Sequence, residues 1–448
     1  MACLMEIDIP VYVRDVLNIL EKNRHDAYVA GGCVRDSLLG KEPGDWDVAT
    51  DCVPEKMMEI FPNAVPTGIK YGTVTVLTGG GPVEVTAFRT DSGYSDGRRP
   101  GSVKFTKNLC KDLERRDFTI NSIAYNLKSG LIDPLGGVCD LKNRIIRCSG
   151  DPSVRFAEDY LRILRAFRFS AKLGFLIEPE TKKAAVQNKW RLLKISAERV
   201  QKEFNEILLR SGYKELDDFL SEFSEVLLPE LYACKGITQR NNNHRYDVFD
   251  HIVRGTADYT GNDIKVKLAI LLHDVGKSKC KTTDEMGLEH FYGHGEISEQ
   301  LAKNILIRMK YPGDVVRDVC RLIKHHHILI EPNEGFAKKM LREFGREQAF
   351  RLMELKIADT GNLKESRKCW TEEIMECRKL MFSIIEKKQP CSLADLAVNG
   401  TDIIKHLNLV PSERVGEILE YLLDRVIDDP KLNEKKTLLE IAAEIPTV

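Results

Sequence analysis

The stretch that decides the fold is Tyr28-Val29-Ala30-Gly31-Gly32-Cys33-Val34-Arg35-Asp36, which is followed closely by Asp45-Trp46-Asp47. It predicts a strand, a bend at two glycines, a short helix and then two carboxylates two positions apart. Because residues i and i+2 of a strand point to the same face, Asp45 and Asp47 can hold divalent metal ions together. The glycines let backbone amides approach a polyphosphate. The pattern therefore indicates transfer of a nucleotide from a nucleoside triphosphate.

A third carboxylate ligand is expected beside this pair, because two-metal phosphoryl transfer requires enough negative charge to hold both ions. Glu84 is the best candidate, since it is a lone charge in the β-rich run Val83-Glu84-Val85-Thr86, where a charge is costly without a partner. The alternative is that Asp45 and Asp47 are surface turn residues. The diglycine and the Arg-Asp pair that precede them favour the metal site.

The bulk properties restrict the class of protein. A length of 448 residues predicts three or four structural units. The formal net charge of −1 excludes an overall basic nucleic-acid binder but permits a local basic face. The 12 cysteines form no Cys-x-x-Cys pair, which suits a reducing compartment. No apolar run reaches the ~18 residues typical of a membrane span, and the N-terminus lacks a signal-peptide pattern. We therefore expect a cytoplasmic protein without a membrane segment.

The chain changes character near residue 140. Before that point short β-rich runs alternate with short helices, and strands are expected at 28–31, 46–50, 73–77 and 83–88. After it, helical segments continue with almost no strand pattern. The predicted fold class is therefore α+β, with a small α/β head that contains a mixed β-sheet and a helical remainder. The expected bounds are 1–142 for the head, 143–212 for a helical neck, 213–375 for a helical body and 376–448 for a helical tail.

Several ordered motifs resemble those of class II tRNA nucleotidyltransferases and bacterial poly(A) polymerases, which belong to the polymerase β superfamily. The matching stretches are 31–50, 83–89, 115–121, 155–169 and 195–200. The resemblance implies a nucleotidyltransferase head, a helical neck, and addition of nucleotides from CTP and ATP to a tRNA 3′ end. Residues 396–402 and Asn433 resemble the tail of bacterial family members, where they are expected to shape a platform for the tRNA elbow.

The resemblance also implies roles for residues of the head. Asp45 and Asp47 would bind the catalytic Mg²⁺. The nucleotide-binding residues that it implies there are Gly31, Gly32, Arg35, Arg116, Asp117 and Asn121. The residue chemistry agrees, since arginine suits phosphate and a carboxylate such as Asp117 suits a ribose hydroxyl. Asp117 could also be the N-cap of a helix that begins at residue 118.

The neck is expected to contain one helix over residues 155–170. Its apolar stripe at helical spacing consists of Phe156, Tyr160, Leu164 and Phe167. Asp159 and Arg162 lie off this stripe and are three apart, so their side chains are expected to be neighbours. Most pairs of this kind are ordinary intrahelical salt bridges.

The resemblance implies a sharper role for Asp159 and Arg162, namely reading the incoming base, with Arg165 and Arg168 also binding nucleotide. Cytosine and adenine present an amine donor beside a ring-nitrogen acceptor, which a carboxylate and a guanidinium complement. Uracil and guanine would leave buried polar groups opposed. We therefore expect selection of CTP and ATP without a nucleic-acid template.

Two further features bear on the RNA substrate. The polar loop 91–102 contains Asp96-Gly97-Arg98-Arg99-Pro100, which resembles a family loop associated with the step from C to A addition; its composition also fits a mobile surface loop. Residues 155–202 hold 12 Lys/Arg and 5 Asp/Glu. This local excess indicates a basic groove for the tRNA acceptor stem.

A second constellation lies in the helical half, where eight of the ten histidines fall between His244 and His327. It resembles the HD phosphohydrolase superfamily. The implied metal ligands are His251, His273, Asp274 and Asp359, with His294 and His326 available for a second ion. Such ligands suit Mg²⁺ or a transition metal such as Mn²⁺, Fe²⁺ or Ni²⁺ rather than structural zinc. A working site would hydrolyse a phosphomonoester or cyclic phosphate; the alternative is a body that has lost this activity and serves as a tRNA platform.

The favoured prediction is a CCA-adding tRNA nucleotidyltransferase with an HD domain. An alternative within the same class is a poly(A) polymerase or an enzyme restricted to A addition, although the chain shows no strongly basic C-terminal extension. An alternative from another class is an HD nucleotide phosphohydrolase with a regulatory head.

Overall fold

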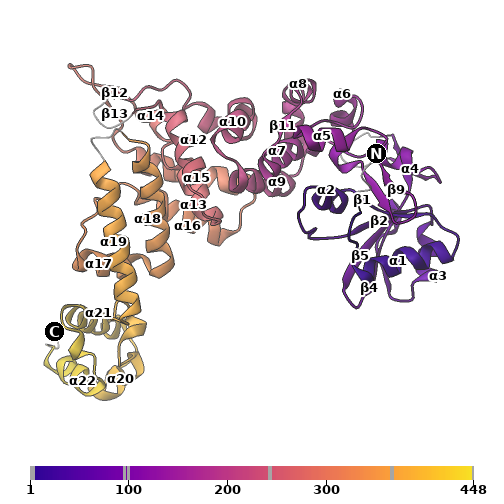
Figure 1. Cartoon of the computed structure of the whole chain (residues 1–448). Helices are drawn as coiled ribbons and strands as arrows, with labels where there is room; N and C mark the ends of the chain where they lie inside the picture. The colour runs from indigo at the N-terminus through magenta and orange to yellow at the C-terminus, as the bar shows by residue number, and fades with distance from the viewer. Residues whose placement is uncertain (1–5, 94–96, 98–100, 241–244, 364–367, 446–448) are drawn as a thin grey trace. The chain divides into compact units, whose positions relative to one another are not determined.

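The computed structural model describes residues 6–93, 97, 101–240, 245–363 and 368–445. The chain divides into two compact units, Met1–Pro229 and Glu230–Val448. The first contains a β-sheet with helices around it and a run of further helices, and the second is almost entirely helical (Figure 1). This confirms the predicted α+β class with a mixed sheet in the head. The finer predicted bounds within each unit stay predictions.

A mixed seven-stranded sheet forms the head, in the order β3-β4-β5-β2-β1-β8-β9. Its strands are β1 Ala27–Ala30, β2 Asp47–Thr50, β3 Ala64–Gly68, β4 Thr73–Thr78, β5 Gly81–Ala87, β8 Ala124–Asn126 and β9 Gly130–Ile132. β2 and β5 are parallel, and the other neighbouring pairs are antiparallel. The four expected strands are all present, with ends within two residues of the prediction.

Short helices accompany this sheet. They are α1 Val11–Lys22, α2 Gly32–Leu38, α3 Pro54–Ile60, η1 Ile69–Tyr71, α4 Leu109–Glu114, η2 Thr119–Asn121 and α5 Gly137–Asn143. α3 begins at Pro54, where a proline suits the first turn because its missing N–H would have no partner there.

The composition of residues 91–102 predicted a loop, but the segment is not a loop throughout. It is entered by β6 (Arg89–Ser92) and left by β7 (Ser102–Phe105), and these two strands pair antiparallel. Three residues singled out in this loop, Asp96, Arg98 and Pro100, lie outside the described residues.

The remainder of the first unit is helical apart from two parallel two-residue strands, β10 (Ile145–Ile146) and β11 (Leu176–Ile177). Its helices are α6 Pro152–Glu158, α7 Leu161–Leu173, α8 Pro179–Gln187, η3 Lys189–Lys194, α9 Ala197–Arg210 and α10 Tyr213–Leu227.

The prediction of one helix over 155–170 is wrong, because the backbone breaks between α6 and α7. Asp159 is extended, with φ −136° and ψ 106°, and its Oδ1 accepts a hydrogen bond from the Leu161 amide at 3.1 Å. An aspartate side chain that bonds a nearby backbone amide competes in this way with the helix. Of the expected stripe, Phe156, Leu164 and Phe167 are buried, while Tyr160 at the break is only partly buried.

The second unit is built from helices and one pair of two-residue strands. Its elements, with α11 at the division, are α11 Pro229–Tyr232, α12 Val248–Asp258, α13 Ile264–Leu272, α14 Lys277–Cys280, β12 Thr282–Thr283, β13 Glu289–His290, α15 His294–Arg308, α16 Gly313–Lys324, α17 Glu334–Phe344, α18 Arg346–Gly361, α19 Lys368–Glu386, η5 Leu393–Asp395, α20 Gly400–Leu407, α21 Glu413–Asp428, η6 Pro430–Leu432 and α22 Lys435–Glu444. Among these helices, α17, α18 and α19 lie side by side (Figure 1). None of the helices in the described ranges has the length and hydropathy of a membrane span.

α13 is the central helix of this unit, since every residue from Val266 to Leu272 is buried. From Val266 to Leu272 its sequence is apolar apart from Lys267, which donates to the Thr256 carbonyl. A helix that is apolar all round must be surrounded by other elements. The residues that follow α13, beginning with His273, therefore lie in the interior of the second unit.

The last three helices have a small core of their own. Val398, Ile403, Ile418, Leu422 and Leu438 belong to it. Asn433 closes the segment that precedes α20: its Oδ1 accepts from the Ala397 amide and its Nδ2 donates to the Asp395 carbonyl, both at 2.8 Å. Asn433 and the 396–402 stretch thus hold the tail fold together.

Candidate functional site

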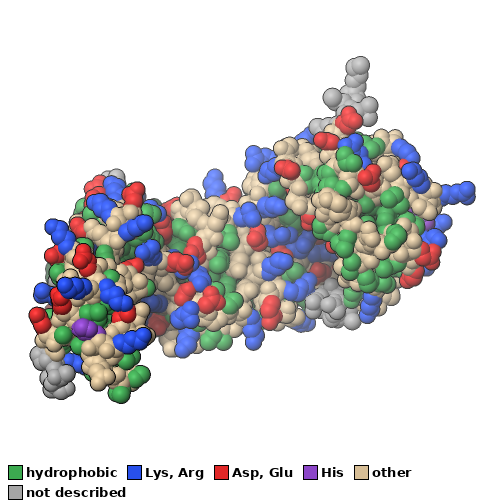
Figure 2. Space-filling view, turned by 90° about the horizontal axis from the view of Figure 1, so that it is seen from below, with side chains coloured by type: hydrophobic (Ala, Val, Ile, Leu, Met, Phe, Trp, Pro, Cys, Tyr) green, Lys and Arg blue, Asp and Glu red, His purple; other side chains and the backbone are tan. Residues whose placement is uncertain are grey.

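A cavity of about 610 Å³ opens in the first unit. Its lining includes every site residue that the sequence predicts for the head and neck: Gly31, Gly32, Arg35, Asp45, Asp47, Glu84, Arg116, Asp117, Asn121, Asp159, Arg162, Arg165 and Arg168. Nine lining residues are basic and five are acidic, so the cavity suits a polyanion. In the space-filling view, Lys and Arg side chains gather in the shaded hollow beside the head (Figure 2).

Three carboxylates lie at one side of this cavity. Asp47 is the first residue of β2 and is the register partner of Glu84 on the parallel strand β5. Asp45 lies in a bend before the strand, not in the strand as expected. Glu84 is exposed while Val83 and Val85 are buried, so it lies on the open face of β5 and is not a costly buried charge.

The three carboxylates repel one another. The pKa of Asp47 rises to about 6, chiefly because of burial and then because of the charges of Glu84 and Asp45. A divalent cation between them would relieve this repulsion, and carboxylate oxygens are the ligands that hard cations prefer. The donor set therefore fits the Mg²⁺ expected from the sequence.

The diglycine bend brings basic side chains to the cavity. Gly31 has φ +86°, and its carbonyl accepts the first bond of α2 from the Arg35 amide at 3.1 Å. A Cβ on Gly31 would lie 2.7 Å from Nη1 of Arg116. Arg35 is buried and donates from Nη1 to Oδ1 of Asn121 at 2.5 Å. The glycine is therefore required by both its conformation and its neighbour.

Asp117 is the buried anion of this network. Its Oδ2 accepts from Nε of Arg165 at 2.8 Å, and its Oδ1 accepts from Nδ2 of Asn121 at 3.0 Å and from the Phe118 amide. Burial acts to raise its pKa, but the charge of Arg165 and these hydrogen bonds lower it to about 2. The N-cap of η2 is Phe118. Asp117 therefore does not cap that helix.

Asp159 and Arg162 both line the cavity, but they do not pair with each other as the helical spacing suggested. Asp159 forms an ion pair with Nη2 of Arg199 on α9 at 3.5 Å. Arg162 donates from Nη1 to Oε2 of Glu158 at 2.7 Å and from Nη2 to the Arg115 carbonyl at 2.9 Å. The break at Asp159 removes the i,i+3 geometry and gives each side chain its own partner.

The sequence did not indicate that the aromatic ring of Phe169 lies among the arginines of the cavity. The guanidinium carbons of Arg35, Arg165 and Arg168 lie 5.2, 5.4 and 4.5 Å from the centre of the Phe169 ring. Such cation–π contacts orient guanidinium groups. Phe169 stands in the matching stretch 155–169, but an aromatic residue in a helix usually indicates packing alone.

Besides Lys172, three more basic residues of the cavity, Arg89, Arg115 and Arg199, were also missed as site residues. All three stand inside the motifs 83–89, 115–121 and 195–200, which could have indicated them. Arg115 forms ion pairs with Asp112 at 2.7 Å and with Asp91 at 3.4 Å.

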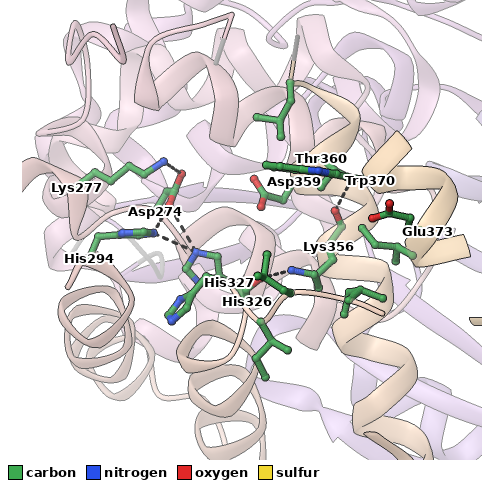
Figure 3. A pocket seen from close by; sticks show the side chains of 15 residues that line it. Asp274, Lys277, His294, His326, His327, Lys356, Asp359, Thr360, Trp370 and Glu373 are labelled. Atoms are coloured by element: carbon green, nitrogen blue, oxygen red, sulfur yellow. Dashed lines mark hydrogen bonds and ion pairs between the residues drawn. The ribbon is translucent and has the colours of Figure 1, made fainter. Parts of the chain in front are cut away.

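A second cluster lies in the second unit, and it brings together all six predicted HD residues. His251, His273 and Asp274 form one group that could hold a metal ion, and Asp274, His294 and His326 form another. Asp359 joins the first group, with its Oδ1 2.9 Å from Nε2 of His251 and 3.5 Å from Nε2 of His273. Part of this cluster is shown in Figure 3.

The backbone fixes which ring nitrogen of each histidine faces the cluster. Nδ1 of His273, His294 and His326 lies 2.8, 2.7 and 2.6 Å from the carbonyl oxygens of Ile270, Phe291 and Ile323. Each Nδ1 therefore donates, and each Nε2 is left as an acceptor that can ligate a metal.

Two buried atoms of the cluster, Nε2 of His273 and Oδ1 of Asp274, form no hydrogen bond among the described residues, and each lies 3.4 Å from an ion-pair partner, Oδ2 of Asp274 and Nε2 of His294 respectively. Buried polar atoms are almost always hydrogen-bonded, so such exceptions require an explanation. Both atoms belong to groups with metal-ligand spacing. A bound metal ion would satisfy them, and the residues thus fit a metal site.

The electrostatics of the metal-free cluster are uneven. Burial acts to lower the pKa of His273, but Asp274 and Asp359 outweigh it and raise the pKa to about 9. Burial and the nearby His273 lower the pKa of His326 to about 3. Lys277, which sequence reasoning did not assign, donates from Nζ to Oδ2 of Asp274 at 2.6 Å. The cluster is therefore compensated by the protein's own charges.

Comparison with known proteins points to one enzyme family. A family model described as "Poly A polymerase head domain" matches residues 27–147, one described as "Probable RNA and SrmB- binding site of polymerase A" matches 174–234, and one described as "tRNA nucleotidyltransferase domain 2 putative" matches 282–442. The chain is 47% identical to the CCA-adding enzyme of Geobacillus stearothermophilus over 424 residues, 94% of each chain. It is 33% identical to the CCA-adding enzyme of Geobacillus sp. (strain WCH70), over 95% of this chain and 94% of that relative.

Solved structures agree. The crystal structure of the Bacillus stearothermophilus CCA-adding enzyme in complex with CTP has a TM-score of 0.71 at 30% identity, with coverage of 97% of this chain and 96% of that one. The Thermotoga maritima CCA-adding enzyme complexed with tRNA has a TM-score of 0.62 at 19% identity, which shows a shared fold over 99% of this chain.

Proposed function

Because the chain belongs to the CCA-adding enzyme family of tRNA nucleotidyltransferases, we propose that it adds C, C and A to tRNA 3′ ends from CTP and ATP. The observation that carries the proposal is the cavity of the first unit, where carboxylates, phosphate-binding groups and base-reading groups converge. The eleven cysteines among the described residues are all free, as in a reducing compartment, and we place the reaction in the cytoplasm.

The carboxylates would supply the metal-binding side of the reaction. Asp45, Asp47 and Glu84 would hold Mg²⁺. When bound, such ions neutralise phosphate charge and favour ionisation of the attacking hydroxyl. The charges of Glu84 and Asp45 both raise the pKa of Asp47, so Asp47 interacts with both of the other carboxylates. We therefore assign it the central ligand position.

The diglycine bend and the arginines would hold the triphosphate. The absence of side chains at Gly31 and Gly32 lets phosphate oxygens approach the backbone and the guanidinium groups of Arg35 and Arg116. Asp117 stays ionised at all physiological pH values and can accept a hydrogen bond from a ribose hydroxyl. Its bond to Arg165 keeps this carboxylate fixed in place.

The reaction then needs correct positioning more than covalent chemistry by the protein. The 3′ hydroxyl of the tRNA attacks the α-phosphate, the bond to the β-phosphate breaks, and pyrophosphate leaves. The basic side chains of the cavity stabilise the charge that moves onto the pyrophosphate oxygens.

Base selection would rest on Asp159 and Arg162. Within the described residues both contacts of Asp159 are made by Oδ1, with the Leu161 amide and Arg199, so Oδ2 can accept from the amine of cytosine or adenine. A guanidinium has five N–H donors, and Arg162 uses three of them on Arg155, Glu158 and Arg115. The remaining donors can serve the ring nitrogen.

Substrate tRNAs truncated at three points test this function. We expect tRNA lacking all of CCA, or its last two nucleotides, to accept label from CTP alone, and tRNA lacking only the final A to accept label from ATP alone. UTP and GTP should give no incorporation. Addition of A to every substrate, or long poly(A) products, would identify one of the alternatives instead.

A second activity is favoured by the cluster of the second unit. We propose that His251, His273, Asp274 and Asp359, with His294 and His326, hold a metal centre for hydrolysis of phosphomonoesters or cyclic phosphates. The observation in its favour is the pair of buried atoms on His273 and Asp274 that lack hydrogen-bond partners. A metal bound there supplies the charge that draws in a phosphate and a water. Metal analysis of the purified protein tests the site directly, and Mn²⁺ or Ni²⁺ suits its ligands.

A further inference from the structure

The ring of Phe169 lies where three arginines of the first unit's cavity meet. The guanidinium carbons of Arg35, Arg165 and Arg168 are all within 5.4 Å of the centre of this ring. Arg35 comes from α2, whereas the other two arginines precede Phe169 on α7. Three cations repel one another, so their common position at one ring requires an explanation.

Each of the three guanidinium groups is also held by one carboxylate. The pairs are Arg35–Asp36 at 2.8 Å, Arg165–Asp117 at 2.8 Å and Arg168–Glu203 at 2.7 Å. Glu203 is buried on α9 and lies outside the lining of the cavity, so it acts on the cavity only through Arg168. The carboxylates compensate the positive charges, and the ring supplies a surface that the three groups share.

The ring of Phe169 is fixed by its own packing. Phe169 is 5% exposed, and its ring meets that of Phe118 edge to face, with 5.7 Å between the centres and 80° between the planes. Phe118 is fully buried and follows Asp117, the carboxylate that binds Arg165. The ring is therefore a rigid support for the guanidinium groups.

The carboxylates leave N–H donors for a ligand. Within the described part of the chain, Asp117 engages Nε and Nη2 of Arg165, so the Nη1 group can serve a phosphate oxygen. Glu203 contacts Arg168 at Nε, so both terminal nitrogens of Arg168 can do the same. The arginines are thus arranged before a substrate arrives, and such preorganisation lowers the cost of binding.

We propose that Phe169 is a positioning residue for the triphosphate, because its ring holds Arg35, Arg165 and Arg168 in the arrangement that receives the phosphate groups. This assignment rests on the proposed nucleotide addition and names a residue on which its triphosphate site depends. All nucleoside triphosphates carry the same phosphate tail. The contribution of the ring is therefore equal for CTP and ATP, and base selection does not depend on it.

Kinetics of nucleotide addition test this role. Phe169→Leu keeps an apolar side chain and removes the aromatic face. We expect its KM for CTP and for ATP to rise by the same factor, about tenfold, while its KM for tRNA and its preference for CTP over UTP stay within about twofold of the parent. Phe169→Tyr, which retains the ring, should restore most of the affinity. Should Phe169→Leu fail to fold, Phe169→Met makes the same test.

Phe175→Leu is the matched control. Phe175 is also 5% exposed and also lies beside a guanidinium group, with 5.6 Å from the ring centre to Cζ of Arg144. Arg144 lies outside the lining of the cavity, so Phe175→Leu should keep the parent KM for both triphosphates.

Binding of inorganic pyrophosphate separates this proposal from the activity on which it rests. Equilibrium dialysis of labelled pyrophosphate with Mg²⁺ requires neither tRNA nor turnover, and any binding in the second unit is common to the variants and cancels. Weaker binding by Phe169→Leu than by Phe175→Leu would support the positioning role even if the parent protein added no nucleotide. Equal binding by these two variants, a KM increase for only one triphosphate, or equal impairment of Phe169→Tyr and Phe169→Leu would overturn it.

Discussion

The cavity of the head and the cluster of the helical unit both gather acidic groups, but they do so in opposite ways. In the head, Asp45 and Glu84 are exposed and no histidine lines the cavity within the described residues. In the helical unit, His251, His273 and Asp274 are buried and their orientations are fixed by backbone carbonyls or neighbouring carboxylates. We therefore propose that the first site would need its substrate to complete the coordination of a metal ion, whereas the second could be assembled by the protein alone.

The two sites also differ in how negative charge is compensated. In the head, burial and then the charges of Glu84 and Asp45 raise the pKa of Asp47 to about 6. Asp274 is surrounded by His273, Lys277 and His294, which hold its pKa well below its usual value despite burial. We propose on this basis that ions arrive with the triphosphate in the head and that the helical unit holds a resident ion. The following experiments test that contrast.

Removal of a head carboxylate should have the largest effect. Asp47→Asn takes away one metal ligand and one charge, so we expect nucleotide addition to fall by about 10³-fold or more. Single-turnover incorporation of labelled CTP into tRNA lacking CCA measures it. Glu42→Gln, an exposed change in the loop before Asp45, should be neutral. If Asp47→Asn retained nucleotide addition, the carboxylates of the head would have no part in the reaction.

Removal of a ligand from the second cluster should lower metal affinity there by about 100-fold or more, since even indirect ligand partners contribute 10–100-fold. His273→Ala is the variant, and metal content after dialysis is the measurement. His290→Ala, which changes a half-exposed histidine outside the cluster, is the matched control. Nucleotide addition should stay within about twofold of the parent, because the two sites lie in separate units. A parallel loss of both activities would contradict their independence.

Asp159→Ala should act on selectivity more than on rate. Loss of the amine acceptor should reduce discrimination between CTP and UTP by about 10- to 100-fold. The measurement is the ratio of kcat/KM values on one tRNA. Glu198→Gln, a charge removal on the neighbouring helix α9, serves as the control. Unchanged selectivity in Asp159→Ala would assign this carboxylate to its pairing with Arg199 alone.

The pH dependence of metal affinity should give the smallest effect, about tenfold per pH unit. In the head, protons compete for Asp47 below its pKa of about 6, so affinity should fall as pH drops below 6 and be level above it. In the second cluster His273 keeps a proton up to about 9, so affinity should continue to rise with pH until then. Mn²⁺ titrations of His273→Ala and Asp47→Asn isolate the two profiles. If metal affinity depended on pH in the same way at both sites, the proposed difference in how their charges are compensated would be wrong.

Local backbone constraints made the head site predictable from the sequence. The diglycine bend of residues 31 and 32, followed by Asp45 and Asp47, needs only a strand and a turn to bring its groups together. Glu84 was also placed correctly, although for the wrong reason, because parallel pairing with β2 and not burial sets its position. His251 and Asp359 lie on α12 and α18, and only resemblance to a known family could join them.

The rest of the site depends on tertiary contacts that no local pattern carries. At the break, the side chain of Asp159 accepts a hydrogen bond from the Leu161 amide, a local contact that competes with the helix expected from the sequence. Phe169 contacts Arg165 and Arg168 of its own helix, but Arg35 comes from a distant part of the chain. Such residues become visible only when the elements are packed.

Gly31 and Gly32 of the head differ in how well each position would tolerate a side chain. A Cβ at Gly32 would meet Nη2 of Arg35 at 3.6 Å, an ordinary contact, whereas one at Gly31 would overlap Arg116 and force a left-handed backbone on a side chain that resists it. A small side chain at Gly32 would therefore meet no obstacle within the protein, and its effect would fall on the approach of the triphosphate instead. At Gly31, any side chain would be excluded by the fold.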